Sequence, residues 1–110
     1  MRAIVFLVLV LTVASPVYAA SDAAQPVKDS AAVQNAVDDR PALLEGRLMR
    51  QMGEDMFLFV DDSGDVIVEI DDDILRGGNV SPGSRVRLNG HVEKDDGSSY
   101  VEVDTLELME

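Results

Sequence analysis

Acidic residues gather in two short runs that have the chemistry to bind a divalent cation. The first run is Asp61-Asp62-Ser63-Gly64-Asp65, and the second is Asp71-Asp72-Asp73. An EF-hand loop supplies oxygen ligands from positions 1, 3, 5 and 12, with glycine at position 6. Counted from Asp61, glycine stands at position 4 and an aspartate at position 12. The EF-hand pattern therefore fails. Turn formation and helix capping explain both runs better, and loose divalent-cation binding stays an open alternative.

The sequence lacks the constellations of catalytic side chains that enzymes use. His91 is the single histidine and there is no cysteine, which excludes a two-histidine metal site, a His-paired nucleophile and thiol chemistry. We expect His91 to be a solvated residue on the outer face of a strand. The serines fall in turns or at helix starts, and the acid pairs that glycoside hydrolysis would need lie in exposed turns. The sequence thus predicts no enzyme, no catalytic or metal-ligating residue and no cofactor.

Five strands are predicted to position the remaining charged side chains. Apolar and polar residues alternate over 42–49, 65–70, 85–92 and 100–108, and residues 56–60 form a nearly continuous apolar strand. Turns are predicted at 51–54, 61–64 and 95–97. Residues 71–77 begin with acids and end with Arg76-Gly77, which predicts a short helix between the third and fourth strands. Gly46 in mid-strand predicts a sharp bend or a close backbone approach, and a phase slip near Thr105-Leu106 predicts a bulge or a strand end.

This order of elements predicts an all-β fold, a five-stranded OB-fold barrel that leaves no exposed sheet edge. A short N-terminal helix is expected, capped by Ser30 and running through Val37, with Val33 and Val37 on one face. The residues expected to form the barrel core are Leu44, Leu48, Phe57, Phe59, Val66, Val68, Ile70, Val86, Leu88, Val92 and Val101.

The outward positions of the strands divide by charge. In an OB barrel the first strand neighbours the fourth, and the third neighbours the fifth. Arg47, Arg85 and Arg87 are then expected to form a small basic patch. The candidate ligand-binding residues lie on the other pair of strands and are all acidic, namely Asp65, Glu69, Glu102 and Asp104. No lysine lies among them. Like charges across strands repel, so this face is expected to attract a cationic partner.

The N-terminus is expected to lie outside the folded domain. Residues 1–19 combine a positive start, an apolar run of about 12 residues and Val17-Tyr18-Ala19, as in a secretory signal peptide cleaved after Ala19. The run is too short for a spanning helix, which needs roughly 20 residues, so we expect a periplasmic protein without a membrane span. Residues 20–40 are expected to be a flexible segment, disordered to about Asp29. Residues 41–110 are expected to form the OB-fold domain.

The net charge restricts the class of partner. The whole chain carries 9 basic and 21 acidic residues, a net charge of −12. Cleavage after Ala19 would remove Arg2 and no acid, leaving 8 basic residues and a net charge of −13. Such a domain repels phosphate backbones, which argues against nucleic-acid binding, and it attracts basic peptides, polyamines or divalent metals.

Several motifs are similar to those of a known family. They are Leu44-Glu45-Gly46-x-Leu48, Phe57-x-Phe59-x-Asp61-x-x-Gly64, Val66-x-Val68-x-Ile70-Asp71 and Val86-x-Leu88-x-Gly90-x-Val92-x-Lys94-Asp95. Together with the signal peptide, the chain resembles the bacterial OB-fold (BOF) family of small periplasmic proteins, the YgiW/YdeI stress-tolerance group. The resemblance implies a non-catalytic periplasmic binding module linked to envelope stress, including tolerance of cationic peptides and oxidants. Many relatives carry an aromatic residue where this chain has Ile74-Leu75.

Two classes of function stay open. The first is a binding protein that captures cationic peptides or another envelope ligand on its outer face. The second is an interaction or structural protein that docks on another envelope component through the first and fourth strands or the N-terminal segment. Salt sensitivity separates the two classes, because binding of a basic peptide should weaken steeply with salt.

Overall fold

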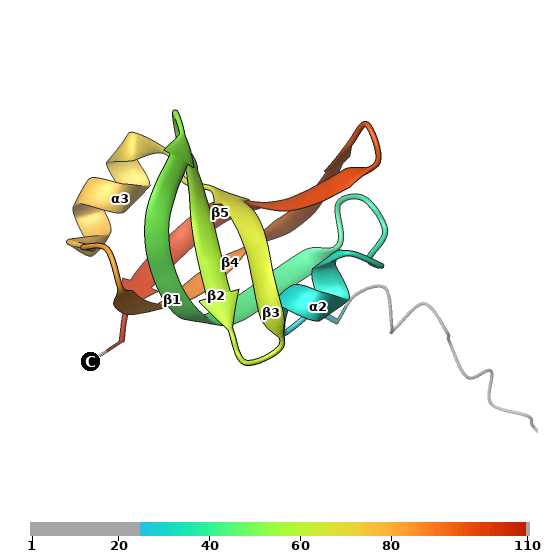
Figure 1. Ribbon diagram of the computed structural model, residues 1–110, viewed down its shortest axis with the longest axis horizontal. Helices are drawn as coiled ribbons and strands as arrows, with labels where there is room; N and C mark the ends of the chain where they lie inside the picture. Colours follow the sequence, from blue (N-terminus) through green and yellow to red (C-terminus); the bar gives the residue numbers. More distant parts are fainter. Residues whose placement is uncertain (1–24, 110) are drawn as a thin grey trace, which may run out of the picture.

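A closed five-stranded barrel forms the body of the protein (Figure 1). The structure, a computed structural model, describes residues 25–109, so the predicted signal peptide at 1–19 lies outside the described residues. The strands are β1 (Pro41–Gly53), β2 (Met56–Asp61), β3 (Gly64–Glu69), β4 (Ser84–Asp95) and β5 (Ser98–Leu108). Their order around the barrel is β1-β2-β3-β5-β4. The predicted OB-type barrel is confirmed, as is the neighbouring of β1 with β4 and of β3 with β5.

β1 is long because it serves two neighbours. Residues from Pro41 to Leu48 pair with β4, and those from Arg47 to Gly53 pair with β2. Gly46 lies where the strand passes from one neighbour to the other. A Cβ at this position would stand 2.5 Å from the Val60 carbonyl oxygen and 2.7 Å from Cζ of Phe59. The close backbone approach predicted at Gly46 is therefore present, and only glycine leaves room for the Phe59 ring beneath it.

The inward side chains fill the barrel as their alternation predicts. All eleven residues expected in the core are buried. The core also includes residues absent from that prediction, namely Val27, Val33, Ala36, Ala42 and Val103.

A bulge interrupts the pairing of β4 with β5. Asn89 lies opposite Thr105, but the next residue, Gly90, lies opposite Val103, so Asp104 is the extra residue. The bulge falls one residue before the predicted slip in phase. An extra residue in one strand bends that strand and redirects its side chains. Here it presses the backbone of β5 toward Gly90, which is buried.

Two short helices lie on opposite sides of the barrel (Figure 1). Helix α3 (Asp72–Gly78) joins β3 to β4, close to the predicted 71–77, and ends at Asn79 in the left-handed conformation with φ of 52°. Ile74 and Leu75 on this helix pack against the core. Within residues 25–109, no helix has both the length and the apolar character needed to cross a membrane.

The N-terminal helix is shorter than predicted. Helix α2 spans Ser30–Val33. Its cap is Asp29 and not the predicted Ser30, because the Asp29 side chain accepts a hydrogen bond from the Ala32 amide. Val37 lies outside the helix and is 63% exposed. The reason is competition from β4: the Asp39 amide donates to the Val92 carbonyl at 2.6 Å, so the chain leaves the helix before Val37.

The segment before α2 differs from the flexible tail expected to about Asp29. Val27 is buried and forms a parallel bridge with Ala42. Its amide donates to the Pro41 carbonyl at 2.9 Å, and its carbonyl accepts from the Leu43 amide at 2.8 Å. This part of β1 pairs with β4 on its other edge. Val27 therefore provides hydrogen-bond partners for the Pro41 carbonyl and the Leu43 amide, which lie on the edge of β1 that β2 does not reach.

Candidate ligand-binding face

A row of outward side chains crosses the barrel from β2 to β4. The pairing places Met56 opposite Glu69, Glu69 opposite Glu102, and Glu102 opposite His91. Two carboxylates thus stand directly across from each other on β3 and β5, as the charge pattern predicts. Adjacent strands lie about 4.8 Å apart, so the two side chains are neighbours on the outer surface.

The β5 bulge brings a third predicted acid to this row. Asp104 Oδ2 lies 3.4 Å from Nδ1 of His91. The other ring nitrogen of His91, Nε2, lies 3.0 Å from Glu93 Oε1 and 3.6 Å from Glu102 Oε2. We call Glu69, Glu102 and Asp104 the acidic face, with His91 and Glu93 at its border.

Asp65 stands apart from the other predicted acids. It lies opposite Val60 near the start of β3, four residues before Glu69. At about 3.3 Å per residue, the two Cα atoms are about 13 Å apart. The structure therefore brings together three of the four predicted ligand-binding residues.

His91 differs from the solvated surface residue expected from the sequence. Its side chain is 25% exposed, and carboxylates approach both ring nitrogens. The alternation of β4 shows that His91 and Glu93 share a face, and the 95–97 turn joins β4 to β5. Pairing those two strands would have placed His91 beside Glu102. What the sequence could not supply is the bulge that turns Asp104 toward the ring.

The pKa values of Glu69 and His91 on this face are both raised. Burial raises the pKa of Glu69, and repulsion from Glu102, Asp71 and Asp55 raises this pKa further. Burial lowers the pKa of His91, but the hydrogen bond and charge of Asp104, together with Glu93 and Glu102, outweigh it, so the net shift is upward. Both shifts favour the protonated form of the group, because an added proton reduces the repulsion among the neighbouring carboxylates.

The predicted basic patch on β1 and β4 is smaller than expected. Arg47 lies directly opposite Arg85, and Nη1 of Arg47 donates to the Gly83 carbonyl at 2.9 Å. Arg87 instead forms ion pairs, with 2.9 Å between its Nε and Glu45 Oε1 and 3.6 Å between its Nη1 and Glu107 Oε1. Arg47 and Arg85 therefore remain side by side, whereas Arg87 is paired with acids.

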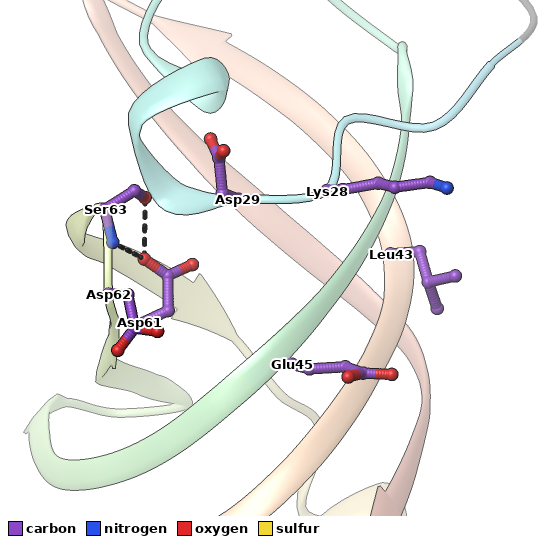
Figure 2. Close-up of a pocket in the computed structure, with 7 residues that line it drawn as sticks. All are labelled: Lys28, Asp29, Leu43, Glu45, Asp61, Asp62 and Ser63. Carbon is purple, nitrogen blue, oxygen red and sulfur yellow. Dashed lines mark hydrogen bonds between the residues drawn. The ribbon is translucent and has the colours of Figure 1, made fainter.

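A groove of about 410 Å³ lies between the start of α2 and the β2–β3 turn (Figure 2). Figure 2 shows Lys28 and Asp29 on one side and Asp61, Asp62 and Ser63 on the other. The Asp61 carboxylate already has protein donors on both oxygens. Its Oδ1 accepts from the Ser63 amide and hydroxyl at 2.9 and 2.7 Å, and its Oδ2 accepts from the Ser30 amide at 2.8 Å.

Asp61 therefore fastens α2 to the β2–β3 turn. Partial burial raises the pKa of Asp61, but these hydrogen bonds outweigh it and the net shift is downward. Asp72 and Asp73 in the second acidic run form ion pairs with Arg76, with N–O distances of 2.9 and 3.1 Å. The β2–β3 turn thus accounts for Asp61, and ion pairs on α3 account for Asp72 and Asp73. The helix capping expected of the second run is not made as a side-chain hydrogen bond at Asp71, the N-cap residue.

Comparison with known proteins gives consistent matches over the barrel. Residues 15–108 match the family described as bacterial OB fold (BOF) protein. The calcium-regulated OB-fold protein CarO of Pseudomonas aeruginosa is 31% identical over 78 residues, which cover 71% of this chain and 67% of CarO. Protein YgiW of Escherichia coli K12 is 34% identical over 66 residues, 60% of this chain and 51% of YgiW. The match thus spans about half the length of YgiW. Neither relative's name describes an enzyme.

Solved structures also resemble this chain over most of its length. The structure of YgiW from E. coli has a TM-score of 0.70 at 26% identity, covering 77% of this chain and 90% of that chain. The telomere capping protein Ten1 from Saccharomyces pombe has a TM-score of 0.57 at 14% identity, covering 77% of this chain and 80% of Ten1. At that identity the likeness to Ten1 concerns the fold alone.

Proposed function

The chain belongs to the bacterial OB-fold family, and we propose that it is a non-catalytic binding protein whose acidic face holds cationic ligands. The observation that carries the proposal is the placement of Glu69 directly opposite Glu102. Two carboxylates at neighbouring positions across strands destabilise the fold. A ligand with one or more positive charges would relieve this repulsion, whereas an anion would be repelled by the carboxylates of the acidic face.

The ligand class that best fits this face is a basic peptide. The acidic face extends over β3 and β5, and half-buried Met56 and Leu58 continue it on β2. A peptide with cationic and apolar side chains would match both surfaces. The net charge of −12 adds long-range attraction for cations and repulsion for nucleic acids. Capture of cationic peptides in the cell envelope would be the route by which such a protein supports stress tolerance.

Substitution of the acidic face tests the proposal. Glu69→Gln, Glu102→Gln and Asp104→Asn combined should weaken binding of a basic peptide by about 1–3 kcal/mol, because each exposed charge pair contributes about 0.2–1 kcal/mol. The salt dependence of binding should become shallower. Relief of repulsion between Glu69 and Glu102 should leave folding unchanged or slightly improved. The measurement is calorimetric titration of parent and variant at two salt concentrations.

A matched control removes three acids elsewhere. Asp62→Asn, Asp72→Asn and Asp73→Asn change the net charge equally, but these exposed carboxylates lie on the β2–β3 turn and α3. This control should retain most of the affinity. Failure of the parent to bind at low salt, or an equal loss in the control, would refute a role for the acidic face. Docking on an acidic envelope partner through Arg47 and Arg85 would then be the leading candidate, recognised as a complex recovered by crosslinking.

We also propose that the protein acts in the periplasm after cleavage behind Ala19. The support is the charge and apolar pattern of residues 1–19. Sequencing the N-terminus of the protein recovered from the soluble periplasmic fraction should give Ala20 as the first residue. Recovery of the intact precursor in the membrane pellet would contradict this expectation.

A further inference from the structure

Three ligand-type side chains meet beside the acidic face. Asp39, His91 and Glu93 each offer one oxygen or nitrogen atom, and these atoms all lie within 4.8 Å of one another. Such spacing suits ligands of one metal ion, since zinc–nitrogen and zinc–oxygen bonds measure about 2.0–2.2 Å. The group includes the single histidine of the chain and two acids that do not belong to the acidic face.

Backbone pairing brings the three residues together. His91 and Glu93 alternate with buried Val92 on β4, so their side chains leave the same side of the strand. Asp39 comes from the turn before β1. Its amide donates to the Val92 carbonyl at 2.6 Å, and the Val92 amide donates to the Arg40 carbonyl at 2.8 Å. The turn is thus held against the residue that separates His91 from Glu93.

A further carboxylate orients the imidazole. Asp104 Oδ2 lies 3.4 Å from Nδ1 of His91 and can accept the N–H of that nitrogen. Nε2 lies 3.0 Å from Glu93 Oε1, so without a metal a proton stands between these two atoms, and a metal ion bound by both would take the place of that proton. Metal-binding histidines in proteins commonly donate their second N–H to a carboxylate in this way. Asp104 therefore has the place of an orienting residue.

We propose that Asp39, His91 and Glu93 bind a divalent transition-metal ion of the Zn²⁺ class, through Nε2 of His91 and one oxygen of each carboxylate. An imidazole nitrogen with carboxylate oxygens suits Zn²⁺, whereas Ca²⁺ and Mg²⁺ take oxygen ligands alone. Two carboxylates balance the charge of the ion. Glu102 Oε2, 3.6 Å from Nε2, stands close enough to complete the coordination or to hold a bound water.

The site can be distinguished from peptide binding by the residues involved. Asp39→Asn leaves Glu69, Glu102 and Asp104 in place, so it should weaken binding of Zn²⁺ and leave binding of a basic peptide unchanged. The metal proposal thus stands or fails independently of the proposed function.

Calorimetric titration with ZnCl₂ and CaCl₂ tests the site. The protein is purified without a histidine tag and treated with chelator. We expect one Zn²⁺ per chain, with weaker and His91-independent binding of Ca²⁺. Asp104→Asn should weaken Zn²⁺ binding about 10–100-fold, the usual effect of losing an orienting carboxylate. His91→Gln should weaken it further, and Asp62→Asn should stay within about twofold of the parent.

The pH dependence provides a second readout. Protons compete with metal for His91, so affinity for Zn²⁺ should fall as the pH drops through the pKa of His91. The groups facing this ring are Asp39, Glu93, Glu102 and Asp104, with Glu69 beyond Glu102. In His91→Gln this dependence should largely disappear. The proposal is wrong if the parent does not bind Zn²⁺, if both His91→Gln and Asp39→Asn bind within twofold of the parent, or if Ca²⁺ binds as tightly as Zn²⁺.

Discussion

Phe59→Ala is expected to unfold most of the protein. Phe59 is 0% exposed and lies opposite Leu48 on β1 and Val66 on β3. Truncating a buried phenylalanine costs about 3–5 kcal/mol, because it removes apolar contact and leaves a cavity. Small domains have total stabilities that begin near 5 kcal/mol. Circular dichroism during thermal or urea unfolding should therefore show little or no cooperative transition from a native baseline.

Val37→Ala is the control for this change. Val37 is also an apolar residue, but it is 63% exposed. Its truncation should change the free energy of unfolding by no more than about 0.5 kcal/mol. A cooperative melt of Phe59→Ala near that of the parent would show that the ring of Phe59 does not support the core.

Gly90→Ala is expected to have the second-largest effect on folding. A Cβ at Gly90 would overlap the Glu102 carbonyl oxygen and stand 2.9 Å from the Glu102 carbonyl carbon and 3.0 Å from Cα of Val103. These atoms are backbone and cannot move aside like a flexible side chain. Relief requires the β4–β5 pairing to shift at the bulge, and such overpacking costs about 1–3 kcal/mol, occasionally more. The midpoint of urea unfolding should fall accordingly.

Gly77→Ala supplies the matched glycine control. Gly77 lies in α3, and a Cβ there would meet no atom within 4 Å. Alanine reduces the freedom of the unfolded chain, so this variant should be more stable by about 0.4–1 kcal/mol. Equal stability of Gly90→Ala and the parent would mean that β5 does not approach Gly90 as described.

Period-two alternation made the barrel predictable from the sequence. A strand with one face in the core repeats its apolar residues every second position, and a shift by one residue would expose all of them. Phe57, Phe59, Val66 and Val68 therefore determine both the strands and their inward faces. Because the strand order of the OB fold places β3 beside β5, the neighbouring of Glu69 and Glu102 followed from the same pattern.

Features that depend on backbone pairing between distant residues were not predictable in this way. Ser30 through Val37 has helical spacing, but the Asp39–Val92 hydrogen bond ends the helical path early. Val27 lies in a polar stretch, and its burial depends on an unfilled edge of β1. His91 has only a partial local signature: Glu93 shares its face of β4, but Asp104 reaches the ring through the β5 bulge and Asp39 comes from the turn before β1. The position of a bulge similarly depends on how two strands fit, and one strand's sequence indicates it only as a change of phase.

The junction of β3 and β5 has the shortest ladder in the barrel. It is the parallel contact among the five described strands, and its ladder has two registered pairs, Val68–Val101 and Glu69–Glu102. Short ladders separate at a lower free energy than long ones, and the repulsion between Glu69 and Glu102 lowers that free energy further. A cation bound between these two carboxylates would stabilise the pairing of β3 with β5. Amide hydrogen exchange in β3 and β5 would then slow when the cation binds, so exchange rates would report cation binding without any change in the overall fold.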